Sequence, residues 1–186
     1  PEGGIGVYNP YEEADVRRVW GSPFRAERAA ERAERIGVPI PPGISPEDRV
    51  IWIAPGETIL CHTEEFIGGR NIVTTMMKAR SSWGRNFIEV CKCAGWGDIG
   101  YINRWTLEVT NNSRYYHIPL VVGRRIAQIA FFEVQPVEAD YVRQLGKYQA
   151  SQDVKVLKAT WTPEAMLPRI FQDRETVAAL ARICPP

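Results

Sequence analysis

The sequence predicts a mainly β protein with helices toward both ends. Between residues 49 and 134, short runs rich in Val, Ile, Thr and aromatic residues recur, each bounded by Gly, Pro, Asn or Ser. The strong helix-forming runs lie outside this region, so βαβ units are not expected. Several short strands at this spacing are typical of an all-β barrel or sandwich.

The composition sets limits on the class of protein. The 186 residues fit one domain with a sizeable core, and 45% hydrophobic with 24% charged residues is ordinary for a globular protein. The formal net charge of +1 predicts neither a nucleic-acid polymer nor a membrane surface as partner. No apolar run approaches the roughly 18 residues of a membrane span, and no basic-then-apolar signal opens the chain. We expect a cytoplasmic protein.

The first 48 residues predict a helical extension. Residues 1–10 are rich in Gly and Pro and predict a loop. A short helix is expected over residues 11–20. A stronger helix is expected over residues 24–36, where Ala alternates with Arg and Glu and opposite charges recur three and four residues apart. Gly37 suits the end of this helix.

Residues 49–150 are expected to form the β core. Pro55-Gly56 marks a turn after the first strand. The predicted strands cover residues 50–54, 57–63, 72–78, 86–93, 104–110, 115–122 and 125–134.

Residues 151–186 are treated as a C-terminal extension. Before it, residues 140–147 predict a helical turn. A final helix is expected over residues 174–183, with Asp173 as its N-cap and two prolines at its end.

The four cysteines are expected to be free thiols. Cys91 and Cys93 would share one face of a strand, and a C-x-C spacing rarely closes a disulfide. Unpaired cysteines are usual in a reducing compartment.

The stretch from Arg80 to Arg85 is the densest polar segment between strands. Arginine and hydroxyl groups suit phosphate oxygens, and Gly84 allows backbone N–H groups to approach an anion. The alternative is a polar turn with surface arginines.

Two carboxylates follow this stretch. Asp98 lies in a Gly-rich segment, residues 95–101, that predicts a hairpin able to present main-chain groups to a base; a plain hairpin with an Asx-turn is the alternative. Glu108 would share a strand face with Thr106. If that face lines a cleft, burial would raise the pKa of Glu108 toward that of a general base. A solvent-facing Glu is the alternative.

Two weaker patterns complete the search. His62-Thr63-Glu64 matches half of a zinc deaminase signature, but Cys91-Lys92-Cys93 has the wrong spacing for the other half, so we expect no zinc. Gly146-Lys147-Tyr148-Gln149 could form a mobile lid over phosphates. Its alternative is an ordinary connection.

Taken in order, these segments resemble the dCTP deaminase branch of the dUTPase-like superfamily. The matching motifs are Pro55-Gly56-Glu57, residues 80–85, residues 94–101, Thr106-Leu107-Glu108 with Asn111, Arg125-Ile126-Ala127-Gln128, and residues 146–149. The resemblance covers roughly residues 50–150. After Gln149 the chain departs from the family's pattern, Gly97 replaces the usual Ile, and Trp83 replaces a smaller aliphatic residue.

The resemblance implies a distorted β-barrel of jelly-roll type, assembled as a homotrimer with active sites between subunits. It implies zinc-independent deamination of dCTP to dUTP, in which Glu108 activates the attacking water. Ser81 and Arg85 would hold the water and the tetrahedral species. The substrate-binding set would be Arg80, Ser82, Lys147 and Gln149 at the triphosphate with Mg²⁺, Asp98 at the deoxyribose, and the main chain of Trp105 and Thr106 at the base. Tyr148 would also belong to the substrate-binding set.

Three functions remain open on the sequence. The first is dCTP deamination, alone or with hydrolysis of the dUTP formed, and with dTTP as a candidate inhibitor. The second is dUTP hydrolysis to dUMP and pyrophosphate, in which Asp98 would activate water. The third is a non-catalytic regulatory protein that binds a nucleotide on the same fold.

Overall fold

The computed structural model describes residues 6–136, 140–141 and 146–173. The chain divides into two compact units, one formed by residues 24–162 and the other by residues 1–23 with 163–186. The predicted helix over residues 174–183 and most of the predicted turn over 140–147 lie outside the described residues. No helix in the described part is long and apolar enough to cross a membrane.

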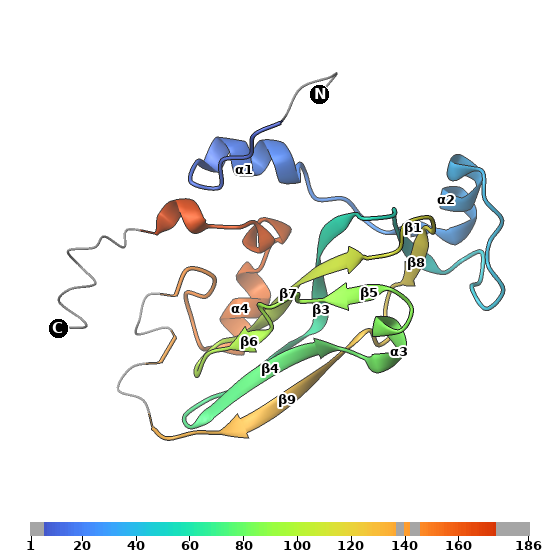
Figure 1. The fold of residues 1–186 in the computed structure, drawn as a ribbon. Coiled ribbons are helices and arrows are strands. Elements are labelled where there is room, and N and C mark those ends of the chain that lie inside the picture. Colours follow the sequence, from blue (N-terminus) through green and yellow to red (C-terminus); the bar gives the residue numbers. More distant parts are fainter. Residues whose placement is uncertain (1–5, 137–139, 142–145, 174–186) are drawn as a thin grey trace. The chain divides into compact units, whose positions relative to one another are not determined.

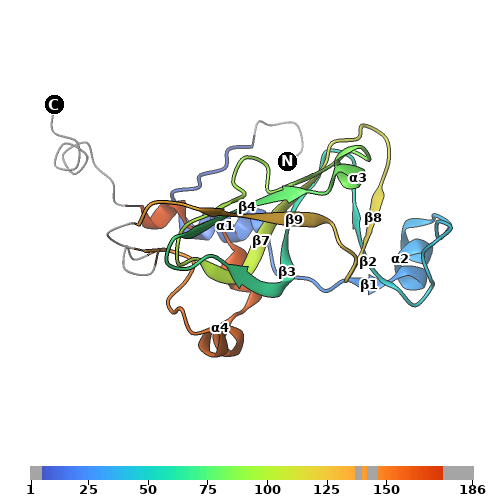
Figure 2. The ribbon, with the colours of Figure 1, turned by 90° about the horizontal axis from the view of Figure 1, so that it is seen from below.

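The larger unit is mainly β, as the sequence predicts (Figures 1 and 2). Its strands form three antiparallel three-stranded sheets, in the orders β1-β2-β8, β3-β7-β5 and β6-β4-β9. Among the described strands no hydrogen-bonded ladder closes these sheets into a barrel. The strands are β1 (Glu27–Arg28), β2 (Arg49–Ile53), β3 (Thr58–Gly68), β4 (Val73–Ala79), β5 (Ile88–Val90), β6 (Trp96–Gly97), β7 (Ile102–Asn111), β8 (Ile118–Val121) and β9 (Ala127–Glu133).

Strand β7 is central to the main core. It lies between β3 and β5 (Figure 1), and its alternate side chains Trp105, Leu107 and Val109 are buried. The residues that alternate with them, Arg104, Thr106 and Glu108, are half-buried. This alternation is what a strand with one face toward a core produces. It leaves the second face of β7 partly open to a ligand.

Strand β3 carries a bulge opposite the middle of β7. His62 pairs with Thr106, whereas the next paired residue, Phe66, lies opposite Arg104. Two extra residues of β3 are therefore accommodated between these pairs. The Thr63 hydroxyl holds the bulge, because its oxygen accepts the Trp105 N–H at 2.9 Å and donates to the Glu65 carbonyl at 2.7 Å.

The helix predicted over residues 24–36 is shorter than expected. Helix α2 covers Ala29–Ile36 and ends at Gly37, which has the left-handed conformation that the sequence predicts. The residues before it are extended, because Glu27 and Arg28 pair with β2. Strand pairing here outweighs the helix propensity of the Ala, Arg and Glu run. The buried side chains of Ala29 and Ala33 lie on one face of α2.

The strand predicted over residues 86–93 is also too long. Strand β5 ends at Val90, and Cys91 and Lys92 follow with positive φ angles of 62° and 39°. Cys91 is buried and Cys93 is exposed, so the expected shared face is wrong. Cys61, Cys91 and Cys93 are free thiols, as predicted. Burial raises the pKa of both Cys61 and Cys91 to about 12.

Residues 95–101 do not form the predicted hairpin. Strand β6 pairs with β4, whereas β7 pairs with β3 and β5, so the chain passes from one sheet to another. A turn makes the passage: the Tyr101 N–H donates to the Asp98 carbonyl at 3.0 Å, and Gly100 takes a φ of 89°. Position three of such a turn requires a positive φ, which favours glycine.

Five further helical elements complete the described chain, two in the larger unit and three in the smaller one. The polar stretch at 80–85 forms the short helix α3 (Ser81–Gly84) rather than an open turn. Helix α4 (Val154–Thr160), which the sequence did not predict, begins at Asp153, whose side chain accepts the Lys155 N–H. The smaller unit holds α1 (Glu13–Trp20), expected from the sequence, and the 3-10 turns η1 (Pro163–Met166) and η2 (Ile170–Gln172).

Candidate active site

Glu108 occupies the partly open face of β7. It faces Leu60 of β3 across the ladder, and its main-chain carbonyl accepts the Cys91 N–H at 2.9 Å. Burial raises the pKa of the Glu108 carboxyl, while a bond to its own main chain and the positive charge of Lys92 lower it. A partly desolvated carboxylate of this kind is suited to accept a proton from water.

An aromatic cluster lies beside Glu108. The Tyr101 ring meets Trp105 edge-on at 5.4 Å and Tyr141 at 5.2 Å between centroids. Burial, followed by the nearby tyrosines and Glu108, raises the pKa of Tyr101, so its hydroxyl stays neutral. Burial raises the pKa of Tyr141 as well, and the charge of Asp98 adds to this effect. Asp98 and Glu108 therefore border one cluster of phenolic hydroxyls.

The segment of residues 146–149 packs against the start of β7. The buried Gln149 side chain accepts the Ile102 N–H at 2.6 Å and donates to the Gly100 carbonyl at 2.9 Å. The Tyr148 N–H donates to the Tyr141 hydroxyl at 3.1 Å. Both amide atoms of Gln149 thus hold the turn that carries Asp98, whereas Lys147 acts electrostatically on Tyr141.

Helix α3 presents a second group of predicted site residues. Arg80 precedes the helix and donates from Nη1 to the Arg125 carbonyl at 3.2 Å. Ser81, Ser82 and Arg85 are exposed, and within the described part of the chain their side chains form no hydrogen bond or ion pair. Within one chain, Asp98, Glu108 and residues 147–149 therefore lie on neighbouring elements. The side chains of Ser81, Ser82 and Arg85 have no partner among the described residues and can contact a ligand.

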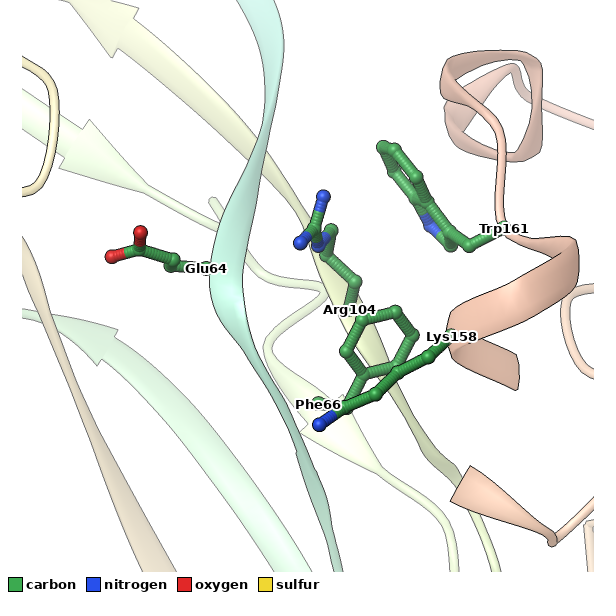
Figure 3. A pocket seen from close by; sticks show the side chains of 5 residues that line it. All are labelled: Glu64, Phe66, Arg104, Lys158 and Trp161. Atoms are coloured by element: carbon green, nitrogen blue, oxygen red, sulfur yellow. The ribbon is translucent and has the colours of Figure 1, made fainter. Parts of the chain in front are cut away.

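A pocket of about 380 Å³ opens beside the same face of β7 (Figure 3). Glu64, Phe66, Arg104, Lys158 and Trp161 line it. The Arg104 guanidinium lies 5.2 Å from the Phe66 ring and 4.8 Å from the Trp161 ring. The sequence reasoning missed this pocket. Strand alternation places Arg104 on the face of Thr106 and Glu108. Lys158 and Trp161 are distant in sequence, so their part in the pocket could be recognised only from the position of α4.

Metal-ligating side chains do not gather in the described ranges. No set of three or more His, Cys, Asp or Glu residues there could hold a metal ion. His62, the residue from the zinc-like pattern, lies edge-on against Trp161 with 4.7 Å between centroids.

Comparison with known proteins gives a consistent set of relatives. A "dCTP deaminase, dUMP-forming" of Leptospira biflexa is 38% identical over 112 residues, covering 59% of each chain. The protein of that name from Methanopyrus kandleri is 34% identical over 126 residues, 67% of this chain and 61% of its own. One from Nanoarchaeum equitans is 34% identical over 96 residues, 52% of this chain and 48% of its own. The chain thus spans about half to three-fifths of these relatives.

Solved structures similar to this chain include two dUTPases. The native EIAV dUTPase aligns with a TM-score of 0.42 and 20% identity over 50% of this chain and 78% of its own. The dUTPase of a Staphylococcus bacteriophage aligns with a TM-score of 0.37 and 14% identity over 49% and 75%.

The family assignment depends on a match that covers most of the chain. The model of one family, described as dCTP deaminase-like, matches residues 14–134, a range that includes α3, the Asp98 turn and the whole of β7. This match covers well over half of the chain. The chain belongs to the dCTP deaminase-like family.

Proposed function

We propose that this protein hydrolytically deaminates dCTP, with Glu108 as the general base. The observation that carries the proposal is the half-buried Glu108 carboxylate, whose pKa is raised by burial on the open face of β7. Glu108 takes a proton from water as the water oxygen bonds to C4 of cytosine. That proton passes to N3 of the ring, and the proton of the new C4 hydroxyl passes through Glu108 to the exocyclic nitrogen. The C4–N bond then breaks and ammonia leaves. The pyrimidine keeps the oxygen as its new carbonyl.

The remaining predicted site residues serve this step in the proposal. Ser81 and Arg85 hold the water and stabilise the tetrahedral species. The main chain of Trp105 and Thr106 reads the base, and Asp98 contacts the deoxyribose. Arg80, Ser82 and Lys147 contact phosphates, with Tyr148 and Gln149 fixing the neighbouring turn. Since the side chains of Ser81, Ser82 and Arg85 are exposed and form no bond in the described part of their own chain, we propose that this segment of a neighbouring copy completes each site in a homotrimer.

We further propose that dUMP, rather than dUTP, is the product released. The support is that the relatives described above are named as dUMP-forming dCTP deaminases. A second water would then attack the α-phosphorus of dUTP, and pyrophosphate would leave. Mg²⁺ bound to the phosphate oxygens would supply charge neutralisation for that displacement. Phosphate oxygens and water would provide its ligands, since Mg²⁺ usually retains several waters.

The test measures ammonia and pyrophosphate from dCTP in parallel. We expect both products from the wild type with Mg²⁺. Glu108→Gln keeps the shape of the side chain but cannot accept the proton, so ammonia release should fall about 10²–10⁴-fold. Glu89→Gln, on the neighbouring strand β5, is the matched control and should retain activity.

Each other outcome selects a different function. Pyrophosphate from dUTP without ammonia from dCTP would identify a dUTPase, and neither product would identify a nucleotide-binding regulator. Ammonia without pyrophosphate would leave deamination standing and remove the dUMP-forming step. Loss of activity with a zinc-selective chelator, in the presence of Mg²⁺, would contradict the zinc-independent step.

A further inference from the structure

Arg104 lies at one end of a strip that begins at Glu108. Arg104, Thr106 and Glu108 occupy alternate positions of β7, so their side chains share the half-buried face. Four residues of extended strand separate the Cα atoms of Arg104 and Glu108 by about 13 Å. A nucleoside triphosphate likewise carries its base at one end and its terminal phosphates at the other. The strip therefore has the polarity of such a ligand.

The charge of Arg104 is held in place without being neutralised. Phe66 and Trp161 flank its guanidinium (Figure 3), and cation–π contacts of this kind fix its position. Among the described residues Arg104 forms no ion pair, and its buried Nε has no hydrogen-bond partner. The guanidinium therefore keeps its positive charge beside the pocket, where an oxyanion can pair with it.

Lys158 adds a second positive charge to the same pocket. It comes from α4, and its Nζ lies 6.0 Å from the centre of the Phe66 ring. Glu64 also lines the pocket, but its carboxylate points to the other side of β3 from Arg104 and Lys158 (Figure 3). The pocket of about 380 Å³ thus holds the positive charges of Arg104 and Lys158, while the Glu64 carboxylate points away from them. This arrangement favours the binding of an anion with several charges, such as a polyphosphate.

We propose that this pocket binds the terminal phosphates of the nucleotide whose base reaches Glu108. The proposal builds on the proposed function and adds phosphate contacts from the same chain as Glu108. It also gives a role to the region where the sequence departs from the family's pattern. Gln149 is committed to the main chain of Gly100 and Ile102, and α4, which follows it, supplies Lys158.

A direct binding test uses inorganic tripolyphosphate and calorimetry on the full chain. We expect the wild type to bind tripolyphosphate and Arg104→Gln or Lys158→Gln to weaken this binding about tenfold or more, as the loss of a charge-assisted bond predicts. Lys155→Gln is the control, because Lys155 is exposed on α4 and does not line the pocket. Arg104→Lys keeps the charge and should recover part of the affinity. Absence of binding to the wild type, or equal binding by Arg104→Gln, would overturn the proposal.

Kinetics separate this proposal from the proposed function. Arg104→Gln should raise the KM for dCTP at least tenfold with a much smaller change in kcat, because the lost contact binds the phosphates and not the reacting C4 atom. If the wild type binds tripolyphosphate through Arg104 but releases no ammonia from dCTP, the deaminase assignment fails and the pocket stands. If dCTP is deaminated and Arg104→Gln has a wild-type KM, the pocket fails and the deaminase assignment stands.

Discussion

Proton transfer in the proposed reaction depends on the pKa of Glu108, which burial and the charge of Lys92 shift in opposite directions. Burial raises the pKa of the Glu108 carboxyl, and Lys92 opposes this rise. The base must be ionised to accept a proton from water. Activity should therefore fall as the pH drops through the pKa of Glu108, and this pKa should be visible in kcat/KM, which reports on the free enzyme.

Replacing Lys92 tests this balance. Lys92→Gln removes the charge that lowers the pKa of Glu108, so that pKa should rise further and the acidic limb of the kcat/KM profile should move to higher pH. Lys155→Gln, which removes an exposed lysine elsewhere, should leave the limb in place. If the acidic limb of Lys92→Gln stays in place or moves to lower pH, the ionisation seen in kcat/KM is not that of Glu108.

The crowded surroundings of residue 97 explain why glycine stands there instead of the family's usual Ile. A Cβ atom built at Gly97 would lie 2.6 Å from the Trp105 indole and 2.3 Å from the Thr75 hydroxyl. The buried indole therefore occupies the space that a side chain at position 97 would need. The unusual glycine and the large ring at position 105 are a matched pair.

At the scale of elements, the bulge in β3 shapes the pocket. It separates the His62–Thr106 pair from the Phe66–Arg104 pair, and its Thr63 hydroxyl bonds both the Trp105 N–H and the Glu65 carbonyl. Bulges commonly redirect side chains near active sites. Here Glu64 and Phe66, on either side of the bulge apex, both line the pocket.

Thr63→Val should destabilise this arrangement. Valine has the same shape but leaves the Trp105 N–H without its acceptor, at a cost of about 1–3 kcal/mol in the free energy of unfolding. Urea denaturation of Thr63→Val and Thr63→Ser makes the comparison, since serine keeps the hydroxyl. Equal stability of the two variants would mean that the hydroxyl does not hold the bulge.

At the scale of the whole molecule, strand β9 points to self-association. Within the described strands it pairs only with β4, and the consecutive Phe131 and Phe132, on opposite faces, are 52% and 42% exposed. The Trp96 ring, itself 55% exposed, stacks on Phe132 at 6.2 Å. Exposed aromatic residues on an edge strand are typical of an interface. They are consistent with self-association, which the proposed homotrimer requires.

Analytical ultracentrifugation tests this assembly. The wild type should sediment with three times the 21.1 kDa mass of the chain, and Phe131→Asp should shift it to the monomer. Phe24→Asp is the control, because Phe24 is an exposed phenylalanine of the same unit outside β9. A monomeric wild type, or a Phe131→Asp variant that remains trimeric, would contradict the assembly or its interface.

The sequence predicted the class of fold and most strand positions because they depend on local patterns. Strand alternation placed Glu108 and Thr106 on one face, and Gly37 ended its helix, as the structure confirms. The failures had non-local causes: β2 draws Glu27 and Arg28 out of a helix, and β6 pairs with β4 instead of completing a hairpin. The pocket at Arg104 depends on α4, whose position no local pattern encodes. The roles of the site residues stay predictions.

The bulge at residues 63–65 has a consequence for the changes in length that β3 can accept. It adds two residues to β3, an even number, and side chains alternate along a strand with a period of two. Every residue on both sides of the bulge therefore keeps its inward or outward orientation. Lengthening or shortening β3 here in steps of two would resize the pocket beside Arg104 and leave the buried set on β7 unchanged. The size of the proposed phosphate pocket can then change without repacking the core.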